Sequence, residues 1–285
     1  MVNSLLPADN MHTLVFLHIP KAGGSSLRQV LQRQFRADQT LTIATGRGPW
    51  SQVRATPESR RMQIRYVQGH VFYGIDQYFA QPSAYITLMR DPVDRILSHY
   101  YYVRRLPTHH LHQVVVSNNM SLKDYVASDL VWGLSNQQTR MICGLPTVRQ
   151  LSQQNLAQAK ANLEMHFALV GLMEQYDESL VLAKRIFGWR NVYYVRRNVT
   201  RARRPKRDVP QDVLDIIAER NQLDIDLYQF AQQRFARVSE AYGPTFERDL
   251  TLFQAINSAY QALSAGLRPM LGRLRSVRER RRKAG

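Results

Sequence analysis

Short apolar runs alternate along the chain with segments of helical periodicity. Residues 13–19 read TLVFLHI and residues 84–89 read AYITLM, as expected for parallel strands buried on both faces. Weaker strand candidates are 65–68, 168–172 and 192–195, whereas 40–60 reads as a loop. Apolar positions at a 3.6-residue spacing predict helices at 25–35, 91–105, 121–130, 135–142, 152–166, 177–187, 211–239 and 245–264. This alternation predicts an α/β fold of three layers, with a mainly parallel sheet flanked by helices and a helical C-terminal part.

The length and the distribution of hydrophobic residues indicate one folded unit. The chain has 285 residues, of which 44% are hydrophobic and spread throughout, so it is long enough to bury a core. We predict a single domain over 1–265 and a mobile basic tail over 266–285. Residues 268–283 hold eight basic residues and one acid, a net +7 of the chain's +17. Such a run is usually solvated, and an anionic partner for the tail is the alternative.

A loop with the chemistry of a phosphate cradle follows the first strand. Residues 20–26 read PKAGGSS and lie between a buried strand and a helix. Two glycines let the backbone approach an anion, which the N–H groups and the helix N-terminus then hold. Lys21 adds a positive charge, and Ser25 and Ser26 add hydroxyl donors. The loop is not a Walker A motif, because its lysine precedes the glycines. An ordinary glycine turn is the alternative interpretation.

A second anion-binding candidate follows the strand at 84–89. Residues 90–98 read RDPVDRILS, so Arg90 stands at the strand's carboxyl end, where open α/β sheets bind ligands. Ser98 lies about two helical turns further on and can share an anion with Arg90. Arg95 is instead expected to be structural, in an ion pair with Asp91 or Asp94.

These two motifs, in this order and setting, resemble the Golgi-type carbohydrate sulfotransferases. Residues 16–27 (FLHIPKAGGSSL) resemble their 5'-phosphosulfate loop, and 90–100 (RDPVDRILSHY) resemble their 3'-phosphate segment. The resemblance implies a P-loop-like fold and PAPS (3'-phosphoadenosine 5'-phosphosulfate) as donor, with no metal required. It assigns the donor to Lys21, Ala22, Gly23, Gly24, Ser25, Ser26, Arg90 and Ser98. Residues 195–198 (VRRN) resemble the loop over the nucleotide, which adds Arg196 and Arg197.

The acceptor side resembles the heparan sulfate and uronyl 2-O-sulfotransferases. Residues 66–73 (YVQGHVFY) are similar to a segment with two histidines, the second of which is the general base. His70 falls on that base, and Gln68 stands in place of the first histidine. The implied reaction moves the sulfuryl group of PAPS to a hydroxyl of an acidic or neutral carbohydrate, such as a uronic-acid polysaccharide, with Lys21 stabilising charge. Arg104 and Gln68 are the candidate acceptor-binding residues.

Three alternatives stay open. One is a kinase-like nucleotide-dependent transferase, another is a nucleic-acid-binding protein that uses the +17 charge, and the third is a family member that binds PAPS without turnover. A metal site at His109, His110 and His112 is disfavoured, because no second ligand cluster stands at suitable spacing. The neighbours of Cys143 favour burial over nucleophilic chemistry.

The predicted location is the cytoplasm of a bacterium. One cysteine allows no intrachain disulfide, no apolar run reaches about 20 residues, and residues 1–11 do not read as a signal peptide. This prediction departs from the setting of the Golgi enzymes.

Overall fold

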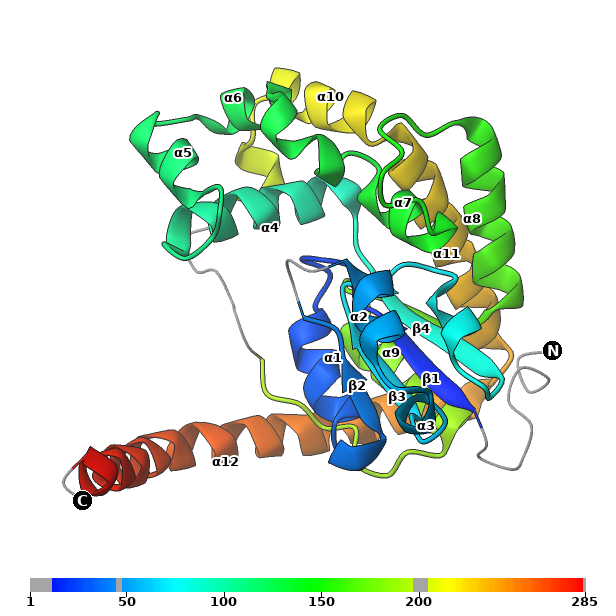
Figure 1. Cartoon of the computed structure of the whole chain (residues 1–285), viewed down its shortest axis with the longest axis vertical. Helices are drawn as coiled ribbons and strands as arrows, with labels where there is room; N and C mark the ends of the chain where they lie inside the picture. The colour runs from blue at the N-terminus through cyan, green and yellow to red at the C-terminus, as the bar shows by residue number, and fades with distance from the viewer. Residues whose placement is uncertain (1–11, 45–47, 197–204, 284–285) are drawn as a thin grey trace.

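A parallel sheet forms the centre of the molecule (Figure 1). The computed structural model describes residues 12–44, 48–196 and 205–283, without the side chains of 131–132 and 266–283. Within this part, five strands pair in the order β2-β3-β1-β4-β5, and every pair is parallel. The strands are β1 (Thr13–Leu17), β2 (Thr40–Thr42), β3 (Tyr66–Gly69), β4 (Ser83–Met89) and β5 (Phe167–Leu172). The predicted α/β class is confirmed.

The strands are positioned by burial on both faces. Every residue of β1 and of β5 is buried, which explains why both appear in the sequence as continuous apolar runs. The expected strand at 192–195 is wrong, because that segment pairs with no strand. Conversely, the stretch read as a loop contains β2 and two short helices, α2 (Pro49–Ala55) and α3 (Glu58–Arg61).

Helices cover the sheet and build a second lobe beyond its carboxyl edge (Figure 1). Helices α8 (Gln153–Met165), α9 (Tyr176–Phe187) and α11 (Gln222–Glu240) pack on β5. A separate apolar cluster joins α4 (Pro92–Arg105), α5 (His112–Ser117), α6 (Leu122–Ala127) and α10 (Gln211–Arg220). The remaining helices are α1 (Gly24–Leu31), α7 (Gln137–Cys143) and α12 (Pro244–Lys283), with 3₁₀ turns at Ala37–Gln39, Ile75–Tyr78, Asp129–Leu134 and Lys206–Asp208.

A buried ion pair ties the two lobes together. Arg95 of α4 and Asp224 of α11 are both fully buried, with Nη2 3.6 Å from Oδ2. The guanidinium also donates to Gln137 Oε1 at 2.7 Å and to the Leu134 carbonyl at 2.6 Å. Asp224 accepts from the backbone and hydroxyl of Thr139 at 2.8 and 2.9 Å. Arg95 therefore has the structural role predicted for it, but the ion pair formed is with Asp224 of α11 rather than with the Asp91 or Asp94 named from the sequence.

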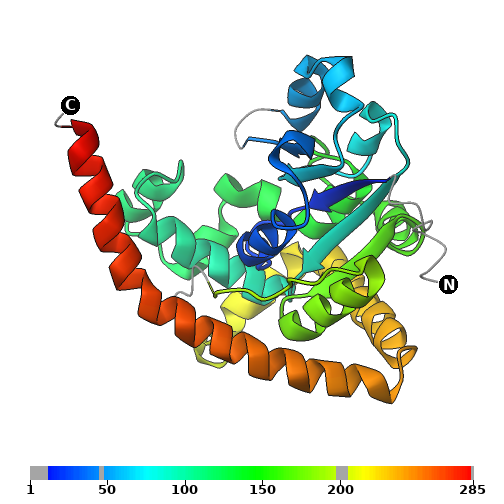
Figure 2. The same cartoon turned by 90° about the horizontal axis from the view of Figure 1, so that it is seen from below.

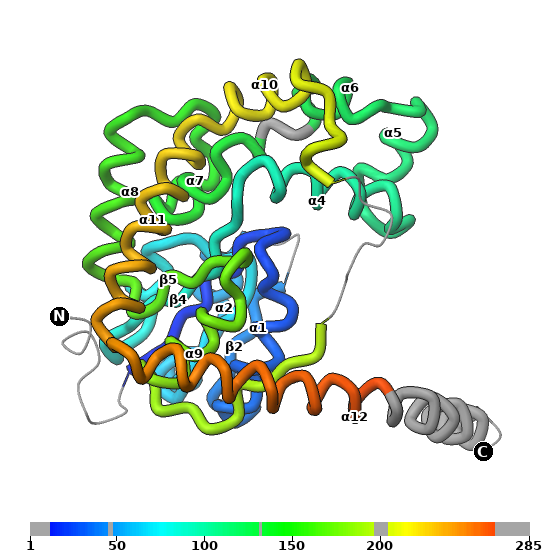
Figure 3. Tube along the Cα trace, turned by 180° about the vertical axis from the view of Figure 1, so that it is seen from behind, coloured from blue at the N-terminus to red at the C-terminus, as the bar shows by residue number. Residues whose placement is uncertain are grey.

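Helix α12 runs along α9 and then leaves the body of the molecule (Figures 2 and 3). Arg185 of α9 holds its first turns through Asp249 Oδ2 at 2.8 Å. The backbone of the predicted tail continues this helix as far as Lys283; the domain boundary at 265 and the tail's mobility stay predictions. None of the helices in the described residues is long and apolar enough to cross a membrane.

Candidate functional site

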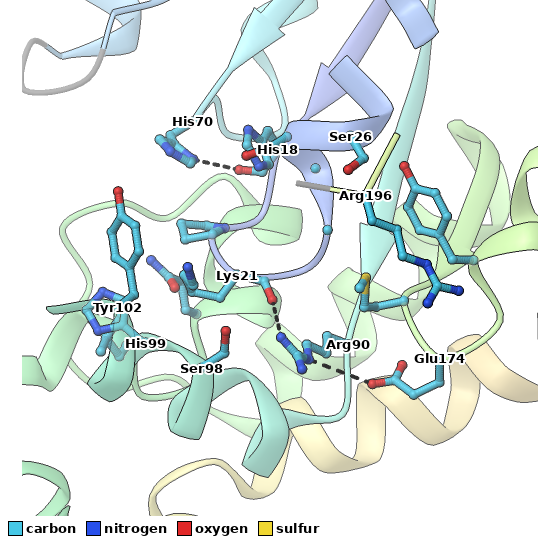
Figure 4. A pocket seen from close by; sticks show the side chains of 18 of the residues that line it. His18, Lys21, Ser26, His70, Arg90, Ser98, His99, Tyr102, Glu174 and Arg196 are labelled. Carbon is cyan, nitrogen blue, oxygen red and sulfur yellow. Dashed lines mark hydrogen bonds and ion pairs between the residues drawn. The ribbon is translucent and has the colours of Figure 1, made fainter. Parts of the chain in front are cut away.

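A cavity of about 1070 Å³ lies where four strands end. His18 follows β1, His70 follows β3, Arg90 follows β4, and Glu174 lies just after β5, and all four line it. Carboxyl ends of parallel strands are the usual ligand edge of an open α/β sheet. The cavity therefore collects the chemistry of both predicted motifs in one place (Figure 4).

The loop between β1 and α1 forms one wall. Lys21 and Gly23 have positive φ values of 69° and 80°, which turn the backbone sharply before α1 begins at Gly24. A Cβ atom on Gly24 would overlap the His18 ring, so only glycine allows this approach. Ser25 and Ser26 also line the cavity. Ala22 of the same loop, predicted to bind the donor, is fully buried and is not among the residues that line the cavity.

The Lys21 side chain lies across the cavity on an aromatic ring. Its Nζ is 3.7 Å from the centroid of Tyr102 in α4. Burial, with Arg105 and Arg90 adding repulsion, lowers the pKa of Lys21 to about 8. The buried Lys21 ammonium group therefore gains more electrostatic stabilisation from a bound anion than an exposed lysine does.

Arg90 is fixed by its backbone and one end of its guanidinium. The Gln138 side chain bonds both the N–H and the carbonyl of Arg90, at 3.1 and 2.9 Å. Nη1 donates to the Lys21 carbonyl at 2.9 Å, which joins the two motifs directly. Nε lies 3.9 Å from Glu174 Oε1, and within the described residues this buried atom has no hydrogen-bond acceptor. Burial lowers the pKa of Arg90 from its ordinary value, and Glu174 opposes the shift.

Glu174 is shared by three other groups. Its carboxylate accepts from Tyr228 Oη at 2.6 Å and from the Asp91 backbone N–H at 3.2 Å, in addition to facing Arg90. Ser98 lines the same wall, from the second turn of α4. The structure thus brings Lys21, Arg90 and Ser98 to one cavity, and their roles toward a ligand stay predictions.

His70 lies against His18 at the other end of the loop. The His70 Nδ1 atom is 2.8 Å from the His18 carbonyl oxygen, and the two ring centroids are 4.7 Å apart. Burial lowers the pKa of His70, and burial together with His70 lowers that of His18 to about 3. Both imidazoles are therefore neutral at pH 7 in this setting.

Two predicted acceptor residues lie away from the cavity wall. Gln68 is buried in β3, where it donates to Thr42 Oγ1 at 2.7 Å and accepts from Tyr66 Oη at 3.1 Å. Arg104 donates to Tyr100 Oη at 2.7 Å, and neither predicted residue is among those lining the cavity. Their assignment as acceptor-binding residues stays a prediction.

The predicted nucleotide loop is partly described. Arg196 lines the cavity and is hydrogen-bonded to Tyr194. Arg197 lies outside the described residues.

Sequence reasoning missed several residues that line the cavity: His18, His99, Glu174, Tyr176, Tyr194 and Gln254. Tyr102, His109 and His110, which the sequence offered only as weak candidates, line it too. His99 bonds Tyr125 Oη through Nδ1 at 2.7 Å, and burial lowers its pKa to about 3. The His18 signal was available in principle, since it ends the first strand just before the glycine loop.

The histidine and cysteine alternatives find little support. Among the described residues, no three His, Cys, Asp or Glu side chains are grouped so as to hold a metal ion. His112 is engaged with the Val103 carbonyl at 2.8 Å; metal independence itself stays a prediction. Burial raises the pKa of Cys143 to about 11, which disfavours a thiolate at neutral pH.

Comparison with known proteins places this geometry in a family context. The pattern of the "Sulfotransferase family" matches residues 8–231. Heparan-sulfate 6-O-sulfotransferase 3-B of Danio rerio is 28% identical, over 78% of this chain and 63% of its own. Heparan-sulfate 6-O-sulfotransferase 2 of Homo sapiens is 25% identical, over 78% and 44%, and human uronyl 2-sulfotransferase is 23% identical, over 66% and 51%. The chain thus spans about half the length of these relatives. The family resemblance predicted from the motifs is confirmed.

The predicted bacterial, cytoplasmic location is wrong. The matched relatives are carbohydrate sulfotransferases of fish, mammals and Drosophila melanogaster, not bacterial enzymes. The prediction relied in part on the single cysteine, which permits a reducing compartment without requiring one.

Proposed function

The chain belongs to the sulfotransferase family, and from this premise we propose that it moves the sulfuryl group of PAPS to a hydroxyl of a carbohydrate. One observation supports the proposal most strongly. The Lys21 loop, Arg90, Ser98 and His70, predicted from separate parts of the chain, all line a single cavity.

The residues present fit an anionic donor with two phosphate-bearing ends. The loop turns sharply at Lys21 and Gly23 and leads into the N-terminus of α1, an arrangement suited to binding a phosphate through backbone N–H groups. Arg90 keeps a buried Nε without an acceptor on the same wall. We assign the loop, with Lys21, Ser25 and Ser26, to the 5'-phosphosulfate and Arg90 with Ser98 to the 3'-phosphate. Arg196 would cover the nucleotide.

PAPS supplies an activated sulfuryl group, whose bond to the bridging phosphate oxygen breaks as the acceptor oxygen binds sulfur. Lys21 and the loop N–H groups stabilise negative charge on the transferred group and on the departing phosphate oxygen. Such preorganised donors typically contribute 10²–10³-fold each (about 2.7–4 kcal/mol) in comparable sites. Metal-free charge stabilisation is part of this proposal.

His70 takes the proton of the acceptor hydroxyl. The His18 carbonyl can only accept a hydrogen bond, so it fixes the His70 proton on Nδ1 and leaves the lone pair of Nε2 available. The depressed pKa of His70 keeps the ring neutral at pH 7, as a base must be. The proton therefore moves from the hydroxyl to Nε2 as the new sulfur–oxygen bond forms.

A carbohydrate acceptor is proposed from the relatives, whose names specify heparan sulfate and uronyl groups. A uronic-acid-containing polysaccharide is the first acceptor to test. Tyr102, His109 and His110 also line the cavity, and we assign their rings to contact with the sugar.

Calorimetry with PAP, the desulfated product, tests the donor assignment. We expect binding to wild type without magnesium and its loss in Arg90→Ala. Transfer of label from PAPS to a panel of glycans, with His70→Ala as control, then tests turnover. Binding of ATP with magnesium in place of PAP would instead support the kinase alternative, and PAP binding without transfer would support a non-catalytic family member.

A further inference from the structure

The segment 191–196 carries two cavity residues, yet no neighbouring strand holds it. In the described chain the Tyr194 backbone N–H donates instead to the Asn257 side-chain oxygen of α12, at 2.9 Å. Asn257 is 2% exposed, so water does not compete for this bond. A helix side chain thus supplies the bond that a strand would otherwise make.

One face of α12 is built around this segment. Phe253 and Tyr260 lie one turn either side of Asn257, and both rings contact Tyr193, with centroids 5.6 and 6.3 Å apart. Arg33, just after α1, closes the arrangement, since its guanidinium donates to Tyr260 Oη at 3.3 Å and to the Tyr193 carbonyl. The backbone of the segment is therefore gripped from both sides.

Tyr194 passes this constraint to the cavity. Its hydroxyl donates to Asp177 Oδ1 at 2.8 Å and bonds Arg196, and its ring meets Tyr176 edge-on at 4.6 Å. Tyr176 in turn lies against Gly23 of the phosphate loop. A shift of the Tyr194 backbone would move Arg196 and loosen the wall behind the loop.

We propose that Asn257 is a positioning residue for the donor nucleotide, and that α12 completes the donor site although it lies beyond the family match at 8–231. This inference rests on the proposed function, because the ligand whose binding it concerns is PAP or PAPS. Gln254, one turn before Asn257, also lines the cavity, which places α12 at the wall of the proposed donor site.

The test is calorimetry of PAP on Asn257→Leu, which keeps the side-chain volume but removes the acceptor. We expect the Kd for PAP to rise about tenfold, the scale of one lost hydrogen bond in a buried setting. At saturating PAPS, kcat should stay within about twofold and the KM for the acceptor should not change. Asn257 is not assigned to contact either the transferred group or the acceptor. The matched control is Asp249→Asn on the same helix, which weakens the Arg185 bond; it should lower Tm and leave the Kd for PAP unchanged.

Equal PAP affinity in Asn257→Leu and wild type would overturn the inference while leaving the proposed function intact. A wild type that fails to bind PAP would overturn both. If Asn257→Leu does not fold, hydrogen exchange on wild type decides the matter. PAP should slow exchange in 191–196 and in 250–260 together, whereas protection confined to residues before 231 would contradict a role for α12.

Discussion

The Nδ1 atom of His70 lies 2.8 Å from the carbonyl oxygen of His18. Strand register brings the two residues together. Leu17 of β1 pairs with Gly69 of β3, and each histidine is the residue that follows its strand. The hydrogen-bonded ladder of the sheet thus orients the proposed base, which explains how a loop residue keeps one tautomer and one direction.

Replacing His70 with Ala or Gln should lower kcat by about 10²–10⁴-fold, the usual contribution of a general base. The Kd for PAP should stay within about twofold, because His70 is assigned to the acceptor. Single-turnover assays with labelled PAPS and calorimetry with PAP separate these effects. A variant with full activity would remove His70 from the mechanism.

The pH profile of wild type carries a second signature of His70. Because its folded pKa lies below 6.5, the base remains neutral as pH falls through 6.5 and becomes protonated only at lower pH. The acid limb of kcat/KM should therefore have its midpoint below 6.5. A midpoint above 6.5 would contradict a base buried in this way.

The titration of Lys21 should make the affinity for the donor nucleotide fall at alkaline pH. With a pKa of about 8 in the unliganded protein, the side chain loses its charge as pH rises through 8, and binding an anion must then take up a proton. The Kd for PAP should rise above pH 8, by up to about tenfold per pH unit. Calorimetry from pH 7 to 9.5 measures this slope. Lys21→Arg, which stays charged, should have a flatter profile over the same range.

PAP binding should require the planar guanidinium of Arg90, which donates several hydrogen bonds at once, and not merely a positive charge at this position. Arg90→Ala should weaken PAP binding by about 10²-fold or more, since charge-assisted bonds contribute about 1.5–3 kcal/mol each. Arg90→Lys should recover little, because one ammonium cannot bond the Lys21 carbonyl and a phosphate in the same geometry. Thermal shift with increasing PAP gives both values. Ser83→Ala, at the far end of the same strand, is a suitable control.

The fold was predictable where burial is complete. Strands β1 and β4 are continuous apolar runs, and their two-sided burial leaves a clear pattern. Strand β2 escaped prediction because it has only three residues and none is buried. At 191–196, buried Val192 and Tyr194 imitate the alternation of a strand, although the bond of Tyr194 goes to a helix side chain.

The charged residues of the candidate site were predictable from the sequence, whereas the residues that hold them in place were not. Arg90 and His70 stand directly after strands and Lys21 lies in the loop after β1, so their position at one edge follows from the order of elements. Glu174 and Asn257 are brought to the site by the packing of distant helices. No local pattern marks them, so residues 137 to 257 contributed only Arg196 and Arg197 to the sequence-based site.

The Arg95–Asp224 pair allows a prediction about stability alone. Arg95→Ala leaves the Asp224 carboxylate buried without its countercharge and should lower the free energy of unfolding by about 3–5 kcal/mol. Urea denaturation followed by circular dichroism measures this change. A loss below about 1 kcal/mol would mean that the Thr139 bonds suffice for Asp224. The exposed pair Lys123–Asp212 is the control, and Lys123→Ala should cost about 0–1 kcal/mol.

The bond between Tyr194 and Asn257 has a consequence for how the protein is made. Its two partners are 63 residues apart, and the later one lies in the last helix of the described chain. Chains fold from the N-terminus as they are synthesised, so the sheet and the phosphate loop can form while α12 is still inside the ribosome. The nucleotide site would then form in two stages during synthesis. It would bind weakly at first and tightly only after residue 257 has emerged from the ribosome.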